Sequence, residues 1–416
     1  MARRTSLPMK PHFLSCCVVL ALSVSAFSQA TPPKTQAKAI DASKYPSLQA
    51  AFDAVPETGG IVLVAPGDYE ITEPLRVKTG ETRIVGSGAA THIINKNEEG
   101  KPALVLEPAN IEQDKKARLW RVQVADVRIS GNEKSGDGIY AHFIQEIYLE
   151  GVSIDHNGAH GINLVDCFED PRIADSILTY NKLCGINIEG CHDIVVNGNH
   201  FEENQDALRC ADGFNLCMNG NNIDDHLRHG VVIENTYGSV LSGNMIEECN
   251  GTAIILDRDC YGITLSANVI AHHLEGGIDL RDAWGCSISA NTFTIAHKFS
   301  VRASKDSGRN TISANNFCNT HIGGADKRPA EDKTPMGTDE GTGILLAGTS
   351  DTTISGNTFG GLSSAAVWTD GACQRILVSG NIVTDCGRKL PKDAKWINLV
   401  DSVDSLEKEN LMSCKK

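Results

Sequence analysis

One asparagine that recurs at a nearly constant interval limits what this chain can fold into. It stands in the motif (Gly or Ala)-Asn-x-(Ile, Phe or Val). The motif occurs at Asn199, Asn221, Asn244, Asn268, Asn291, Asn315, Asn357 and Asn381. The successive intervals are 22, 23, 24, 23, 24, 42 and 24 residues. Intervals of this size indicate a solenoid, and the interval of 42 indicates an insertion between two repeats.

Each period has room for strands and turns only. Residues 230–252, GVVIENTYGSVLSGNMIEECNGT, contain three short apolar runs separated by polar turns. Repeats built from helix pairs need about 34 residues. We therefore predict an all-β fold, a single-stranded parallel β-helix (a solenoid) of about ten or more coils. Equivalent positions of such coils lie about 4.8 Å apart, so the side-chain amides of the asparagines bond to one another and have a structural role.

The length of the chain is compatible with a solenoid, and its charge bears on its partners. The chain has 416 residues and a net charge of −14, and the acidic balance argues against nucleic acid as a partner. Residues 41–387 are predicted to form the β-helix domain, with an N-terminal cap at 41–71 and an insertion at 323–342. The period is lost after residue 387, so 388–416 are predicted to form a C-terminal cap or tail.

The first thirty residues are typical of a secretory signal. Basic residues at Arg3, Arg4 and Lys10 precede an apolar run at 13–27, and residues 28–30 are the small-residue cleavage site. We expect residues 1–30 to be removed and 31–40 to form a polar leader. The apolar run is too short to span a membrane comfortably. The prediction is a secreted or periplasmic protein with no membrane span in the mature chain.

Twelve of the 14 cysteines lie after this segment. Cys286 stands where other coils carry an inward isoleucine such as Ile263. This position predicts that several of the cysteines are small core residues. Export also permits disulfides, and Cys167 with Cys191 is the alternative pairing because both fall at similar turn positions of adjacent coils.

The segment at residues 41–71 predicts a helix that covers the first coil. Ser47 can cap a helix whose apolar face holds Leu48, Ala51, Phe52 and Val55. A double glycine, a strand and a Pro-Gly-Asp-Tyr turn follow. This segment resembles the N-terminal cap of pectate-lyase-like parallel β-helix proteins, and the later coils resemble the generic right-handed repeat. The resemblance implies a right-handed β-helix. Many such proteins are polysaccharide lyases, hydrolases or epimerases, and others are binding or accessory proteins.

Strand alternation predicts which side chains face outward. In residues 277–282, Ile278 and Leu280 point inward, so Asp279 and Arg281 point outward. Applied coil by coil to the first strand, this rule gives two outward columns. The first column is His142, Val165, Glu189, Ala211, Glu234, Asp257, Arg281, Arg302, Ala347 and Asp370. The second is Tyr140, Asn163, Asn187, Arg209, Val232, Ile255, Asp279, Ser300, Leu345 and Trp368.

The charged part of these columns suits cleavage of an acidic sugar chain by β-elimination, or the related epimerisation. Both reactions need a cation that neutralises the uronate carboxylate and a base that removes the adjacent proton. The predicted catalytic residues are Arg281, Arg302, Lys298, His272, His273 and His297. The predicted Ca²⁺ ligands are Glu234, Asp257 and Asp279. Arg209, Tyr140 and Trp368 are predicted to bind an acidic polysaccharide or oligosaccharide. In the resembled enzymes, the groove on this face carries acidic calcium ligands and a basic catalytic residue.

Two alternatives stay open at this point. A glycoside hydrolase needs two carboxylates about 5 to 9 Å apart, and Asp257 with Asp279 or Asp282 would supply them. The Asn-Thr-Asp, Gly-His-Gly and Arg-Ile-Lys motifs of polygalacturonase-type hydrolases are missing, and the nearest fragment is Gly-Ala-His-Gly at 158–161. The second alternative is a non-enzymatic binding or periplasmic accessory protein. On either reading, alternating charges on an exposed sheet also pair across strands.

Overall fold

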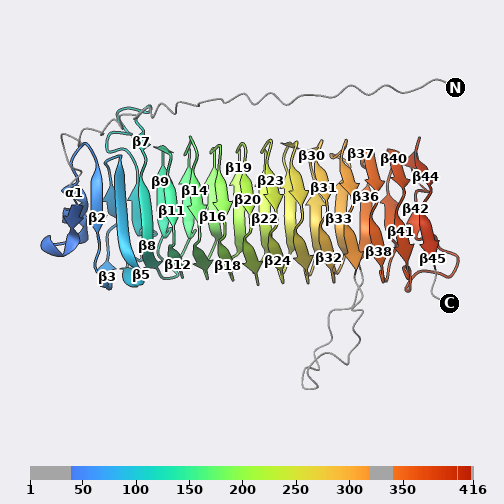
Figure 1. Cartoon of the computed structure of the whole chain (residues 1–416), viewed down its shortest axis with the longest axis horizontal. Helices are drawn as coiled ribbons and strands as arrows, with labels where there is room; N and C mark the ends of the chain where they lie inside the picture. The colour runs from blue at the N-terminus through green and yellow to red at the C-terminus, as the bar shows by residue number, and fades with distance from the viewer. Residues whose placement is uncertain (1–38, 319–340, 401, 414–416) are drawn as a thin grey trace, which may run out of the picture. The chain divides into compact units, whose positions relative to one another are not determined.

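The structure, a computed structural model, describes residues 39–318, 341–400 and 402–413. The predicted signal segment and residues 323–340 of the predicted insertion lie outside the described residues. The described chain winds into a parallel β-helix of about 14 turns. Figure 1 shows the coils following one another in chain order. The predicted right-handed parallel β-helix is confirmed.

The first strands of the coils form a 13-stranded parallel sheet. Its members are β4 (Leu75–Val77), β6 (Leu104–Leu106), β9 (Ile139–His142), β13 (Ile162–Val165), β16 (Cys184–Glu189), β19 (Asp206–Ala211), β22 (His229–Glu234), β25 (Thr252–Asp257), β29 (Gly276–Leu280), β33 (Phe299–Ser304), β36 (Thr342–Ala347), β39 (Val367–Asp370) and β42 (Ile397–Asn398).

The second and third strands of the coils join in one 28-stranded sheet. The second strands are β11 (Tyr148–Glu150), β14 (Arg172–Ala174), β17 (Val195–Asn197), β20 (Cys217–Asn219), β23 (Val240–Ser242), β27 (Thr264–Ser266), β31 (Ser287–Ser289), β34 (Thr311–Ser313), β37 (Ser350–Ser355), β40 (Cys373–Ser379) and β44 (Leu406–Lys408). The third strands are β12 (Ser153–Asp155), β15 (Ile177–Thr179), β18 (His200–Glu202), β21 (Asn222–Asp224), β24 (Met245–Glu247), β28 (Val269–Ala271), β32 (Thr292–Thr294), β35 (Asn316–Cys318), β38 (Thr358–Gly360), β41 (Ile382–Thr384) and β45 (Leu411–Ser413).

The remaining strands lie in the first coils or in turns. The early strands of the large sheet are β1 (Ala39–Asp41), β2 (Gly60–Leu63), β3 (Gly67–Ile71), β5 (Thr82–Asn95) and β8 (Gln123–Ser130), and the short turn strands are β7 (Leu119–Trp120), β10 (Ile144–Gln145), β26 (Cys260–Tyr261), β30 (Ala283–Trp284) and β43 (Ser402–Val403).

Inward side chains alternate with outward ones and fill a continuous core. In β22, Val231 and Ile233 are fully buried, whereas Glu234 is partly exposed. Equivalent residues stack on one another along the axis. The rings of Phe293, Phe317 and Phe359 lie nearly parallel, with centroids 4.8 and 4.6 Å apart. This stacking explains why few aromatic residues are enough to fill a narrow interior.

The asparagine ladder is confirmed. The side-chain amide of each motif asparagine donates to the Oδ1 atom of the next, as from Asn244 to Asn268 at 2.9 Å and from Asn268 to Asn291 at 3.0 Å. The ladder continues one coil beyond the motif, from Asn381 to Asn410 at 2.9 Å. A shorter second ladder joins Asn157, Asn181 and Asn204 at the turn after the third strand.

The N-terminal helix covers the edge of the first coil. α1 (Leu48–Asp53) begins at Ser47, whose side chain accepts from the backbone N–H of Ala50 at 3.1 Å. The side chain of Gln49 accepts from the N–H of Arg76 at 2.8 Å and donates to its C=O at 3.1 Å. The helix therefore satisfies backbone groups at the edge of β4. A short 3₁₀ helix, η1 (Ala42–Lys44), precedes it.

At the C-terminal end, β42, β44 and β45 pair with the three strands of the preceding coil. Residues 397–413 thus add a further coil where the sequence predicted loss of the repeat. Cys167 and Cys191 are free and buried, so the alternative disulfide is not formed. The core position predicted for Cys286 is confirmed, because this side chain is 2% exposed.

The register of one coil differs from the prediction. Arg302 pairs with Asp279, and Ser300 aligns with Gly277. Arg302 therefore belongs to the second outward column rather than to the column of Arg281. The physical reason is that Ser300 occupies the position where other coils carry the small glycine or alanine that starts the first strand.

Candidate functional site

The outward side of the first-strand sheet between β9 and β33 carries a band of polar side chains, here called the first-strand face. Strand pairing places Tyr140, Asn163, Asn187 and Arg209 in one column and aligns Glu234 with Asp257 in the next. Residues far apart in sequence therefore meet on one wall, as the strand alternation predicted.

The charged centre of the face is a set of ion pairs. Asp279 is fully buried beneath two arginines, with Arg281 Nε 2.9 Å from its Oδ2 and Arg302 Nε 2.8 Å from its Oδ1. Arg281 also lies 3.7 Å from Asp257. The predicted calcium ligands are thus brought together on one face, but their carboxylates are held by arginines. A cation would have to displace these arginines.

A second chain of bonds runs from the centre toward the N-terminal coils. Glu234 accepts from Arg209 at 2.6 Å and from Arg258 at 3.0 Å. Asn187 donates to Asn163 at 3.0 Å, and Asn163 donates to Asp137 at 3.0 Å. Arg209, predicted to bind substrate, is one-third exposed and held in place by Glu234.

At the N-terminal end of the face, His142 keeps both ring nitrogens free of close hydrogen bonds to carboxylates. Glu107 and Asp166 lie 4.0 and 3.9 Å from its two nitrogens, beyond hydrogen-bonding distance. Its ring stacks on Phe143 at 4.0 Å, and Tyr140 lies 5.9 Å away between ring centroids. Burial lowers the pKa of His142, so the imidazole is neutral at pH 7 and can accept a proton.

Two groups near His142 complete this end of the face. Burial, with the nearby Glu107 and Asp137, raises the pKa of Tyr140, so its phenol stays protonated and can donate. The Arg118 guanidinium lies 4.1 Å from the ring of Phe143. The sequence placed His142 in an outward column and Tyr140 among the binding residues, but it gave no reason to single out His142 or Arg118.

A third row of polar residues was not predicted as functional. It lies directly before the small residue that opens the first strand of each coil, and consists of Asp137, His160, Cys184, Asp206 and His229. This row could have been found in the sequence, because each of its members directly precedes the glycine or alanine that opens a first strand. In this row the backbone N–H of Cys184 donates to His160 Nδ1 at 3.2 Å and that of Thr252 donates to His229 Nδ1 at 3.0 Å.

These bonds define the chemistry of the row. Burial lowers the pKa of both His160 and His229, and each Nδ1 atom accepts a bond. Each ring is therefore neutral with its proton on Nε2, and it acts as a hydrogen-bond donor rather than a base. Asp206 is fully buried and accepts from Arg228 Nε at 2.9 Å and from the N–H of His229 at 2.9 Å.

The other predicted site residues are distributed around the coil. His273 is buried, its Nε2 bonds to the Ile246 carbonyl at 3.1 Å, and burial lowers its pKa to about 3. His272 lies 3.4 Å from Glu248 at the end of a third strand, and Lys298 lies 3.0 Å from Glu275. His297, between them in the chain, donates its backbone N–H to His273. Trp368 aligns with Leu345 and so continues the column of Arg302.

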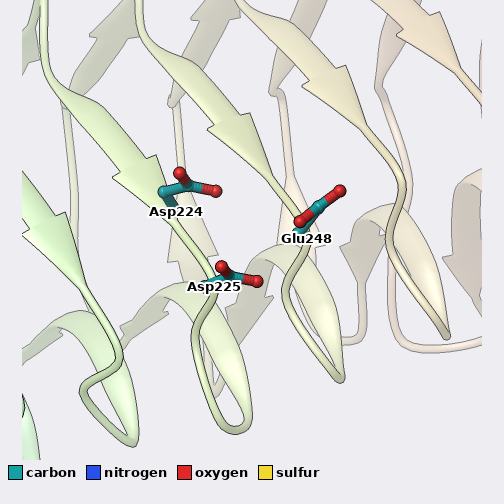
Figure 2. A group of neighbouring side chains, drawn as sticks. All are labelled: Asp224, Asp225 and Glu248. Carbon is teal, nitrogen blue, oxygen red and sulfur yellow. The ribbon is translucent and has the colours of Figure 1, made fainter. Parts of the chain in front are cut away.

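A separate acidic cluster lies at the ends of third strands β21 and β24. Asp224, Asp225 and Glu248 place one carboxylate oxygen each within 4.8 Å of the others. Figure 2 shows the three side chains on neighbouring coils. Burial, followed by the charge of Glu248, raises the pKa of Asp224, and its Oδ1 atom is enclosed without a hydrogen-bond partner among the described residues. Within the described ranges, no other group of three His, Cys, Asp or Glu side chains meets this spacing.

Among the described residues, none of the helices has the length and apolar character needed to cross a membrane.

The fold and the stacked polar face define the class: this is a right-handed parallel β-helix protein. The sequence profile of the family described as "Periplasmic copper-binding protein (NosD)" matches residues 79–257 and 174–328. The two matches together span more than half of the chain. The protein belongs to the NosD family.

Solved structures with the same fold have unlike descriptions. The A-module of the mannuronan C-5 epimerase AlgE4 of Azotobacter vinelandii matches with a TM-score of 0.60 and 16% identity, over 82% of this chain and all of that one. PfbA, a surface adhesin of Streptococcus pneumoniae, matches with a TM-score of 0.57 and 11% identity, over 79% and 91%. ORF18 of Geobacillus virus E2 matches with a TM-score of 0.51 and 15% identity, over 76% of this chain and 60% of that one. At these identities the likeness shows the fold alone. No curated protein sequence matched the chain.

Proposed function

We propose that the protein binds an acidic polysaccharide along the first-strand face and removes the proton next to a uronate carboxylate, which leads to epimerisation or β-elimination. The observation that carries the proposal is His142. It combines a lowered pKa with ring nitrogens free of close carboxylate bonds, next to the phenol of Tyr140. A neutral base and a protonated acid in one place are what this reaction needs.

The roles follow from the charges. Arg118 neutralises the uronate carboxylate, which acidifies the adjacent C–H, and His142 takes the proton. In epimerisation, Tyr140 returns a proton to the opposite side of the same carbon. In elimination, the bond to the neighbouring glycosidic oxygen breaks, a carbon–carbon double bond forms, and Tyr140 protonates the departing oxygen. Arg209, Arg281 and Arg302 bind further carboxylates of the chain, and Trp368 stacks on a sugar ring.

The test compares variants on a panel of uronate polymers. His142→Gln and Tyr140→Phe are expected to lower turnover by roughly 10²–10⁴-fold, whereas Arg281→Ala raises KM more than it lowers kcat. Tyr148→Phe is the matched control, because Tyr148 lies on second strand β11 away from the face. A rise in ultraviolet absorbance reports elimination, and proton NMR of the polymer reports epimerisation.

The outcomes separate this centre from the alternatives. Loss in Asp257→Ala and Arg281→Ala, with His142→Gln unchanged, would move the reactive centre to the charged middle of the face. New reducing ends without a double bond would indicate a hydrolase. Binding without turnover by the wild-type protein would leave a non-enzymatic polysaccharide-binding protein, a reading favoured by the carboxylates that are already paired with arginines.

Copper, named in the description of the family, does not fit the donors found here. The one close group among the described residues is made of three carboxylates, and carboxylate oxygens suit calcium, magnesium or manganese rather than copper. Calcium remains a prediction, and Asp224, Asp225 and Glu248 are the residues to test. Calorimetric titration with Ca²⁺ should give heat in the wild type that Asp224→Asn abolishes. Absence of heat would remove calcium from the proposal.

We also propose that the protein is exported to the periplasm or the medium. The N-terminal signal predicted from the sequence and the periplasmic description of the family support this. Fractionation of cells that express the full chain tests it. Retention of the uncleaved protein in the cytoplasm would contradict it.

A further inference from the structure

A cavity of about 790 Å³ lies outside the first-strand face, at the ends of third-strand segments β8, β12 and β15. Its lining includes Arg128, Asn132, Asp155, His156, Tyr180 and Lys182. The volume is within the range of small-molecule sites, about 300–1,000 Å³.

A buried carboxylate fixes two polar side chains of this cavity. Asp155 is 6% exposed. Its Oδ2 accepts from Arg128 Nε at 2.9 Å, and its Oδ1 accepts from Arg128 Nη2 at 3.2 Å and bonds to His156 Nδ1 at 2.8 Å. The guanidinium and the imidazole are therefore held in place before any ligand arrives, which lowers the entropy lost on binding.

Two rings form an accessible platform at the cavity. His156 and Tyr180 occupy equivalent positions of adjacent coils and stack with centroids 5.0 Å apart at an angle of 22°. Tyr180 is 41% exposed, so its ring is accessible to a ligand, and aromatic rings supply apolar contact area with a polar hydroxyl at one end. Both residues have positive φ, 56° and 57°.

The second ladder of asparagines begins at the same cavity. Asn157 lines the cavity and is 1% exposed. It donates to Asn181 at 2.9 Å, but its Oδ1 has no hydrogen-bond partner among the described residues. An enclosed acceptor without a donor is rare in folded proteins, so a donor from outside the chain would complete it.

We propose that this cavity binds a short carbohydrate segment, with a sugar ring on the Tyr180–His156 platform. Hydroxyl groups both donate and accept, which matches a lining that offers the Arg128 and Lys182 donors beside the Asp155 and Asn157 acceptors. The lining carries both signs of charge, Glu133 and Lys182 among them. Recognition therefore rests on hydroxyl groups and ring faces rather than on a net charge of the ligand. The proposal does not depend on catalysis at the first-strand face.

The turns that line the cavity lead directly into that face. Residues 156–159 connect the cavity to His160, and residues 180–183 connect it to Cys184. A chain seated in the cavity would therefore extend toward the row of Asp137, His160 and Asp206. The cavity would act as an anchoring subsite around the corner from the reacting groups.

The experiment uses the full mature chain and calorimetric titration with short oligosaccharides, one set of uronates and one of neutral hexoses. Tyr180→Ala and Arg128→Gln are each expected to weaken binding about tenfold or more. Tyr180→Phe keeps the ring and should bind like the wild type. Tyr261→Ala is the matched control, because Tyr261 is 55% exposed at a different turn.

Three results would overturn the proposal. One is the absence of binding by both sets of oligosaccharides. Another is equal binding by the wild type, Tyr180→Ala and Arg128→Gln, which would place the ligand elsewhere. The third is an equal loss in Tyr180→Ala and Tyr261→Ala. Failure of the proposed function is distinguishable, because His142→Gln would then leave turnover unchanged while the cavity variants still changed binding.

Discussion

At the scale of single residues, the asparagine ladder shows how a buried amide can stabilise rather than destabilise. Asn268 Oδ1 accepts from the backbone N–H and the side-chain amide of Asn244, at 3.0 and 2.9 Å. Its own amide donates to Asn291 and to the Leu241 carbonyl. Every polar atom of this buried side chain is paired, so the stack links the coils without leaving an unsatisfied group.

We expect Asn268→Ala to lower the free energy of unfolding by about 1–3 kcal/mol, because it leaves two buried donors on Asn244 unpaired. Urea titration followed by circular dichroism measures the change. Asn222→Ala is the control, since that side chain is exposed and should change stability by no more than about 0.5 kcal/mol. Equal effects at both positions would show that the ladder adds no specific stability.

A buried histidine at the end of the second ladder gives a prediction of pH dependence. In the coil after Asn204, His226 stands where the ladder would place its next asparagine, and its Nδ1 bonds to the Asn204 backbone carbonyl at 3.2 Å. It is fully buried, and burial lowers its pKa to about 4. Its Nε2 has no partner among the described residues. Below its unfolded pKa of about 6.5, the unfolded chain binds a proton that the folded chain refuses. Stability therefore falls as the pH drops from about 6.5 toward 4, with a slope of about 1.4 kcal/mol per pH unit.

His226→Asn should remove part of this slope and extend the ladder by one amide. We expect a Tm at pH 7 at least equal to that of the wild type and a smaller loss on acidification to pH 5. Differential scanning calorimetry across that range measures both. His272→Asn is the control, because that histidine is one-third exposed and its partner Glu248 is exposed as well. An unchanged acid slope in His226→Asn would contradict the assignment.

At the scale of elements, the strand ends carry charge in stacked rows. Glu202 pairs with Asp224 at the ends of β18 and β21, and Asp224 and Glu247 each follow the last paired residues of β21 and β24, Ile223 and Ile246. Asp225 and Glu248 come next in the chain. The pKa values of Asp224 and Glu247 are raised by burial first and by neighbouring carboxylates second. This row is therefore under electrostatic repulsion, unlike the first-strand face, where arginines alternate with carboxylates.

Asp224→Asn should raise the free energy of unfolding at pH 7 by roughly 0.2–1 kcal/mol, because it removes a like charge opposite two others. The sign with pH follows from the raised pKa. Near this raised pKa, the folded protein binds more protons than the unfolded chain. The wild-type free energy of unfolding therefore rises as the pH falls toward about 4, the pKa of an aspartate in the unfolded chain. The difference between variant and wild type should vanish below that pH. Urea titrations at pH 7 and below pH 4 measure the difference. Glu112→Gln is the control, because Glu112 is an exposed carboxylate elsewhere in the chain.

The elements were largely predictable from sequence, and the site only in part. The period, the ladder and the Ser47 cap follow from local spacing, so the fold and the α1 cap could be predicted. The alternation of inward and outward side chains predicted the outward columns correctly wherever a glycine or alanine marked the start of the first strand. Ser300 broke that signal, and Arg302 was placed two residues out of register. The ion pair between Arg302 and Asp279 was therefore found only in the structure.

The roles of His142, which sequence reasoning did not single out, and of His273, which it predicted as catalytic, depend on partners that lie far away in the chain. His142 is distinguished by two carboxylates beyond hydrogen-bonding distance, and His273 by a core position that uses both of its nitrogens. Spacing alone does not separate a partly exposed histidine from a buried one in adjacent positions such as His272 and His273. Burial and bonding, which decide their pKa values, are properties of the stacked coils.

At the scale of the whole molecule, stability is close to a sum over coils, because each coil pairs only with its two neighbours. β22 lies between β19 and β25, and its coil runs from His229 to the residue before Thr252. Removing residues 229–251 would bring Asp206 and Thr252 into register. The ladder would then join Asn221 to Asn268, and α1 would still cover the first coil.

We expect this deletion to fold with unchanged far-ultraviolet circular dichroism per residue and a lower free energy of unfolding. It also removes Glu234, which holds both Arg209 and Arg258. Binding of acidic polysaccharide should therefore weaken, while His142, four coils away on β9, keeps its surroundings. Deleting residues 229–239 instead removes half a coil and breaks the register, so that variant should not fold. If both deletions unfolded alike, the coils would not be independent units, and the face could not be a wall built from interchangeable turns.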